Sequence, residues 1–128
     1  MKILLFRIGA IGDVLLTTPA VKCLKKSFPE CEIHYFCGEK AAPILENNPY
    51  IDKLIIFREF FDNTPKLLKT ILMSRHYAKI FNGQKYDLFI DFESSYYSAY
   101  ISFFAESAQK IGFKISGRRA FLNPLYAK

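Results

Sequence analysis

The stretch MKILLFRIGAIGDVLLTTPA, residues 1–20, decides the fold. Its apolar run, Ile3–Ile8, stops at Gly9. Gly12 and Asp13 follow, and a second apolar run comes next. A buried strand that breaks at glycines and opens into a helix is the first unit of a βαβ fold. Because ligands of open α/β sheets bind at the carboxyl ends of the strands, the same stretch predicts where a functional site lies.

Asp13 has two chemical interpretations. A carboxylate at the carboxyl end of a strand can accept a proton from a substrate hydroxyl. Asp is also a favoured helix N-cap, because its side chain accepts the unpaired N–H groups of the first turn. Position alone favours the N-cap. The two interpretations are compatible, since a capped carboxylate can still point into a cleft.

Strands and helices alternate along the rest of the chain. Apolar runs predict strands at 2–8, 32–37, 53–57, 86–92 and 110–113. Helical spacing predicts helices at 41–47, 64–82 and 98–107. It also predicts a first helix, which starts either at Thr18-Pro19 or near Gly12 with a kink at Pro19. This pattern predicts an α/β fold, a Rossmann-like parallel sheet with helices on both faces, in the strand order 3-2-1-4-5. Asp13 and the segment after Asp91 then flank one crevice.

Composition narrows the class of protein. The chain has 128 residues, the size of one domain, and is 51% hydrophobic. It contains no run of the ~18 apolar residues that a membrane span needs. Arg7 and Asp13 interrupt the first apolar run and argue against a signal peptide, so we expect a cytoplasmic protein.

Cysteine and histidine give no metal signal. Three cysteines without Cys-x-x-Cys spacing are expected to be free thiols in the core, at Cys23, Cys31 and Cys37. His34 and His76 lie far apart in the sequence. We therefore predict neither a disulfide nor a metal site.

The formal net charge is +6, and it is unevenly distributed. Residues 110–128 contain five basic side chains and no acid, and residues 58–85 contain six basic side chains against two acids. Such patches attract anionic partners, among which nucleic acid, anionic lipid head groups and sugar phosphates are candidates.

A dinucleotide site is a rival interpretation of the glycines. It requires Gly-x-Gly-x-x-Gly after the first strand. Gly9 and Gly12 take the last two glycine positions, Arg7 stands at the first, and Glu39 could mimic the acid that binds ribose. Two glycines of three make a weak match.

The whole arrangement resembles a known family. KILLFRIGAIGDV at 2–14, with TPAV at 18–21, is similar to the N-terminal half of the heptosyltransferases of glycosyltransferase family 9. These enzymes transfer heptose from an ADP-sugar to the lipopolysaccharide inner core. Weaker pieces follow in the family's order: PECEI at 29–33, NPYID at 48–52, YDLFID at 86–91 and IGF at 111–113.

The chain departs from the family in two places. Most members have Gln-Gly where this chain has Glu93-Ser94, so this position does not support heptose as the sugar. The family also has a two-domain GT-B architecture, whose C-terminal domain binds the nucleotide sugar. We therefore expect residues 1–128 to form the N-terminal, acceptor-side domain, with the donor-binding domain absent and the chain alone inactive.

The resemblance implies an inverting, metal-independent transfer in which Asp13 is the general base, which reverses the preference for the N-cap. It implies substrate-binding residues at Gly9, Ala10, Gly12, Thr18, Glu93 and Ser94. No cofactor is implied beyond an ADP-sugar as co-substrate.

The implied partners are a glycolipid or lipopolysaccharide-core acceptor and the inner face of the cytoplasmic membrane, and not nucleic acid. Two alternatives stay open: a small nucleotide-binding Rossmann domain, and a non-catalytic remnant of the transferase. Apolar residues after Gly117 further predict a loose tail and self-association.

Overall fold

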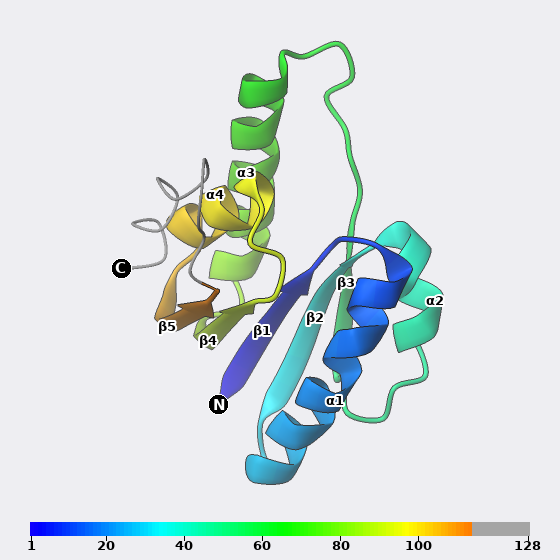
Figure 1. The fold of residues 1–128 in the computed structure, drawn as a ribbon. Coiled ribbons are helices and arrows are strands. Elements are labelled where there is room, and N and C mark those ends of the chain that lie inside the picture. The colour runs from blue at the N-terminus through cyan, green and yellow to red at the C-terminus, as the bar shows by residue number, and fades with distance from the viewer. Residues whose placement is uncertain (114–128) are drawn as a thin grey trace.

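The computed structural model describes residues 1–113, which form a five-stranded sheet with helices on both faces (Figure 1). The tail predicted after Gly117 lies outside the described residues. The elements are β1 (Lys2–Arg7), α1 (Ile11–Ser27), β2 (Glu32–Gly38), η1 (Glu39–Ala41), α2 (Ala42–Leu45), β3 (Lys53–Phe57), α3 (Lys66–Asn82), β4 (Tyr86–Asp91), α4 (Tyr96–Phe104) and β5 (Ser107–Gly112). All strand pairs are parallel, in the order β3-β2-β1-β4-β5. The predicted fold class and strand order are confirmed.

Successive side chains of β1 supply two separate cores. Leu4 and Phe6 pack with α3 and α4 on one face, and Ile3 and Leu5 pack with α1 and α2 on the other. Side chains of a strand alternate between faces, so a strand covered on both sides is apolar throughout. This explains why residues 3–6 are all completely buried.

Helix α1 begins at Ile11 and continues through Pro19, so the later of the two predicted starts is wrong. Proline has no N–H to donate to the carbonyl four residues earlier. Here the hydroxyl of Thr18 donates to the carbonyl of Leu15 at 2.8 Å. The bond that Pro19 cannot make is thereby replaced within the same turn.

The N-cap interpretation of Asp13 is also wrong, and the helix predicted from residue 64 begins at Lys66. Ala10 is the N-cap of α1, without a side-chain bond, and Asp13 lies in the first helical turn. Pro65 is the N-cap of α3. A carboxylate in the first turn still complements the positive end of the helix, so its presence there has a structural rationale.

Three elements differ most from their predicted bounds. Helix α4 spans Tyr96–Phe104 instead of 98–107, because Ser95 caps it through a reciprocal pair of bonds with Ser98. Strand β5 starts at Ser107 instead of residue 110, and it is a partly exposed strand without a continuous apolar run. The helix predicted at 41–47 is the short pair η1 and α2.

The cysteines are free, and two of them are buried. Cys31 and Cys37 lie in the core, whereas Cys23 is exposed, so its predicted burial is wrong. Within residues 1–113, no group of three or more potential ligand side chains is placed to hold a metal ion. No helix in this part of the chain combines the length and apolar character needed to cross a membrane.

His34 carries a buried polar contact between the β2 and β4 strands. Its Nδ1 lies 2.6 Å from the Tyr86 hydroxyl and its Nε2 lies 2.6 Å from a Glu32 carboxylate oxygen. Burial lowers the pKa of His34 below 6.5, against the opposing effect of Glu32. The bond from His34 in turn lowers the pKa of Glu32 below 4.5.

We expect the free energy of unfolding to fall as pH drops below about 6.5, because the unfolded chain then protonates His34 before the folded chain does. Urea unfolding at about pH 7.5 and about pH 5.5 measures this loss, and His34→Gln should reduce it. An equal pH dependence in the variant would show that His34 is not its source.

Candidate functional site

Arg7, the last residue of β1, joins three segments at the carboxyl edge of the sheet. Its Nη2 lies 2.6 Å from Oδ2 of Asp13 in α1. Its Nη1 donates to the Phe92 carbonyl at 2.6 Å and lies 3.4 Å from Oε2 of Glu93. The Asp13 side chain is 48% exposed, against 18% for Arg7. The more buried Arg7 guanidinium therefore holds the Asp13 carboxylate in place, while that carboxylate remains open to solvent.

Glu93 ties the loop after β4 to the loop after β1. Its Oε2 accepts hydrogen bonds from the backbone N–H groups of Ile8, at 3.1 Å, and Gly9, at 3.0 Å. A Cβ at Gly9 would lie 3.2 Å from the same oxygen, closer than ordinary contact. The glycine thus makes room for the chain's own carboxylate.

The loop that carries Glu93 is held in a tight turn. Oδ1 of the buried Asp91 accepts from the N–H groups of Glu93, at 2.7 Å, and Ser94, at 3.2 Å. Ser94 has a φ of 52°, in the left-handed region that few non-glycine residues adopt. Its Oγ is buried without a hydrogen-bond partner among the described residues. Strain and an unsatisfied polar atom often mark functional loops.

The predicted site residues come together in part. Asp13, Gly9 and Glu93 converge through Arg7, and Ala10 and Gly12 lie on the same turn. A Cβ at Gly12 would meet nothing within 4 Å, so space is open there. Thr18 lies roughly one and a half turns farther along α1, and its hydroxyl is bonded to its own helix. It is not part of this cluster.

The sequence analysis missed the role of Arg7, which entered it only as an interruption of the first apolar run and as the residue at the first glycine position of the dinucleotide pattern. Two of its partners, Phe92 and Glu93, come from a segment more than eighty residues away in the chain. The basic residue at the end of a buried strand, with an acid in the following helical turn, was the available signal.

Tyr35 anchors the helix that carries Asp13. Its hydroxyl lies 2.5 Å from Oγ1 of Thr17, in the second turn of α1. Burial raises the pKa of Tyr35 to about 12, so it keeps its proton at neutral pH. This bond holds α1 against the sheet and fixes the position of its first turn.

A cleft of about 500 Å³ opens beside this cluster, over the carboxyl ends of β1, β2 and β3. It is lined by Ile8–Ile11, Gly38–Ala41 and Phe57–Glu59. Glu39, the candidate ribose ligand, pairs with Arg58 at 3.4 Å. The amide donors that would receive a pyrophosphate at the end of β1 are occupied by Glu93. These contacts disfavour a dinucleotide site.

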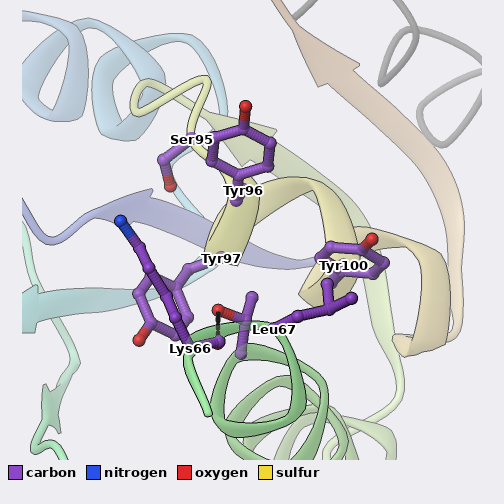
Figure 2. Close-up of a pocket in the computed structure, with 7 residues that line it drawn as sticks. Lys66, Leu67, Ser95, Tyr96, Tyr97 and Tyr100 are labelled. Carbon is purple, nitrogen blue, oxygen red and sulfur yellow. Dashed lines mark hydrogen bonds between the residues drawn. The ribbon is translucent and has the colours of Figure 1, made fainter.

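A second cavity, of about 510 Å³, lies between the first turns of α3 and α4 (Figure 2). Its lining comprises Lys66, Leu67, Thr70, Ser95, Tyr96, Tyr97 and Tyr100. Sequence reasoning did not identify it. The available signal was the tyrosine spacing: Tyr100 follows Tyr96 by four residues and Tyr97 by three. Residues three and four apart lie on the same face of a helix.

Comparisons with known proteins show which proteins the chain is similar to. No family model matches the chain. It is 34% identical over 80 residues to lipopolysaccharide heptosyltransferase 3 of Escherichia coli, which covers 62% of this chain and 23% of that protein. A solved glycosyl transferase family 9 protein from Veillonella parvula is 25% identical, with a TM-score of 0.74 over 87% of this chain and 32% of that one.

The E. coli heptosyltransferase WaaC with ADP matches the fold over the whole chain, with a TM-score of 0.77 at 20% identity, and the match spans 41% of that structure. The chain is a homologue of the family 9 heptosyltransferases and spans about a third of the length of the full enzymes.

Proposed function

We propose that this chain supplies the acceptor side of an inverting sugar transferase, with Asp13 as general base. The sugar would be heptose, moved from an ADP-sugar to a lipopolysaccharide core or related glycolipid. The supporting observation is the half-exposed Asp13 carboxylate, fixed by Arg7 at the point where the strand order reverses between β1 and β4.

The proposed step is a single displacement. The acceptor oxygen attacks the anomeric carbon of the donor while the bond from that carbon to the diphosphate breaks. The hydroxyl proton passes to Asp13. Because Arg7 contacts Oδ2, Oδ1 is the oxygen assigned to receive the proton. The electron pair of the broken bond leaves with ADP.

A second domain would hold the donor in this proposal. One relative is seen with ADP, and this chain spans less than half of it. Within the described residues, the N–H groups after β1 are bonded to Glu93 instead of standing open for a phosphate. Both observations support a division in which this chain binds the acceptor. The uneven positive charge suits an acceptor embedded in an anionic membrane.

The experiment compares the purified chain with the same chain joined to the C-terminal domain of a family 9 relative. Labelled ADP-heptose and a deep-core lipopolysaccharide acceptor are the substrates. We expect no transfer by the chain alone, because donor positioning and stabilisation of the leaving diphosphate supply most of the rate. We expect transfer by the joined protein.

Three results would count against the proposal. Transfer by the chain alone would refute the division between two domains. No transfer by a joined protein that folds and binds ADP would favour a non-catalytic relative. Binding of ADP or NAD by the chain alone would support the nucleotide-binding alternative.

A further inference from the structure

A third cavity, of about 460 Å³, lies along the second half of α3, beside the end of α4. Helix α3 follows β3 and precedes β4, so it runs from the carboxyl edge of the sheet back to the amino edge (Figure 1). Position 79 lies roughly 20 Å along the helix axis from Lys66. The cavity is therefore separate from the Asp13 cluster and from the cavity of Figure 2, which we call the tyrosine cavity. We call the third one the basic cavity, and its lining consists of Leu72, Arg75, His76, Lys79, Asn82 and Phe104.

The basic cavity gathers positive charge without an acid in its described lining. Arg75 and Lys79 are exposed, and neither pairs with a carboxylate within residues 1–113. By contrast, Lys69 of the same helix is paired with Glu59 at 2.8 Å. Helix α3 contains no acidic residue, so like charges four residues apart repel each other with nothing in the helix to offset them. An anion bound between them would remove this repulsion.

Aromatic rings hold two of the basic side chains in place. The guanidinium carbon of Arg75 lies 5.4 Å from the centre of the Phe104 ring. The His76 ring makes edge contacts with Phe60 and Tyr77, at centroid distances of 4.7 and 5.1 Å. Stacking on a ring orients a guanidinium without consuming its N–H groups. The cavity therefore presents an oriented set of donors that the fold itself does not use.

The wall at the end of α4 is fixed against the last turn of α3. The Nδ2 of Asn82 donates to the Phe104 carbonyl at 3.2 Å, and its Oδ1 accepts from the N–H of Glu106 at 2.7 Å. The Asn82 side chain is thus engaged in holding the two helices together. The arginine, the histidine and the lysine remain to contact a ligand.

This set of donors fits a phosphate monoester. The planar fork of an arginine can bind two phosphate oxygens at once, and a lysine can bind a third as a point charge. Arg75 and Lys79 are one helical turn apart, about 6 Å between Cβ atoms, so both long side chains can reach the same tetrahedral group. A carboxylate has two oxygens and a single charge, and it would leave one of the two cations unmatched.

We propose that the basic cavity binds a phosphate monoester through Arg75, His76 and Lys79, carried either by a small soluble molecule or by a lipid head group. The site goes beyond the proposed function and does not rest on it, because it lies away from the carboxyl edge of the sheet. A ligand bound here displaces nothing from the Asp13 cluster.

A titration of the full chain followed by ¹H–¹⁵N NMR tests the site. Glycerol 3-phosphate is the monoester probe, glycerophosphocholine is the diester and acetate is the carboxylate. We expect glycerol 3-phosphate to shift the amide signals of residues 72–79 and 104 saturably. It should bind at least about fivefold more tightly than either of the other probes, and the signals of residues 9–13 should not move.

Three variants separate this site from general positive charge. Arg75→Gln removes a charge from the cavity and should weaken binding of glycerol 3-phosphate about tenfold. Lys66→Gln removes the same charge from the same helix outside the cavity, and binding should stay within about twofold. Arg75→Lys keeps the charge but loses the fork, and it should weaken binding about threefold. Thermal unfolding checks that each variant folds.

Vesicles distinguish the two sources of the phosphate. Phosphatidic acid carries a phosphate monoester and phosphatidylglycerol a diester, so co-sedimentation is compared at matched surface charge. Stronger binding to phosphatidic acid that Arg75→Gln abolishes supports the site and identifies a lipid head group. Binding of glycerol 3-phosphate without this preference supports the site and identifies a soluble ester.

Four results would overturn the proposal: no saturable shift with glycerol 3-phosphate, equal binding of acetate, equal binding of the diester, or equal weakening by Arg75→Gln and Lys66→Gln. The transfer experiment on the joined protein has no bearing on this site. Failure of one proposal therefore leaves the other standing.

Discussion

In the chain joined to a donor-binding domain, Asp13→Asn is expected to lower the rate of sugar transfer by about 100-fold or more. The amide keeps the size of the carboxylate, and its oxygen can still accept the bond from Arg7, so the first turn of α1 is expected to hold its position. The amide that Asp13→Asn introduces cannot take the proton of the acceptor hydroxyl. We expect a fall in kcat and little change in KM for the acceptor.

Asp62→Asn is the matched control. The Asp62 side chain is 92% exposed and lies 4.0 Å from Lys69, and it makes no contact with Arg7, Asp13 or Glu93 among those described. Its replacement should leave the rate within about twofold, because exposed pairs of this kind contribute little. A near-normal kcat for Asp13→Asn, with the melting temperature unchanged, would remove Asp13 from the chemistry and leave it a first-turn helix residue.

Phe36→Ala is expected to lower the free energy of unfolding by about 3–5 kcal/mol. Phe36, on β2, is completely buried. Its ring contacts those of Phe6, Tyr77 and Phe81 at centroid distances of 4.8 to 5.1 Å. Truncation would leave a cavity where the sheet meets α3. Since small domains have a net stability of about 5–15 kcal/mol, this single change removes a large part of it.

Urea unfolding of the purified chain measures the loss. Phe28→Ala is the control, because Phe28 is 49% exposed at the end of α1 and should cost about 1 kcal/mol or less. Equal losses in the two variants would mean that the interface between the sheet and α3 is not the main source of stability.

The architecture was predictable because its signals are local. The strand that breaks at Gly9 and the apolar runs of the inner strands fix the alternation, and right-handed parallel crossovers leave few strand orders. Strand β5 was misplaced for the opposite reason: its residues, Ser107–Gly112, are partly exposed and show no apolar run. Helix α4 was misplaced because a Ser-x-x-Ser capping pair is a weaker signal than the usual Ser-x-x-Glu.

The candidate site was predictable only in outline. Position after β1 made Asp13 a candidate, the family resemblance favoured it as the base, and the predicted strand order brought the segment after Asp91 beside it. The partner of Asp13 was not predictable, because Arg7 acts through contacts with Phe92 and Glu93 that depend on how β1 and β4 pair. The tyrosine cavity likewise depends on the packing of α3 against α4, which no local pattern encodes.

Glu93 has a kinetic consequence for the proposed enzyme. The chain supplies its own anion to the amides of Ile8 and Gly9, so a free nucleotide would have to displace a tethered carboxylate to bind there. Product ADP would then compete with the sugar donor on the other domain, and not with the acceptor on this one. Steady-state kinetics should therefore show that ADP inhibits competitively against the sugar donor and noncompetitively against the acceptor.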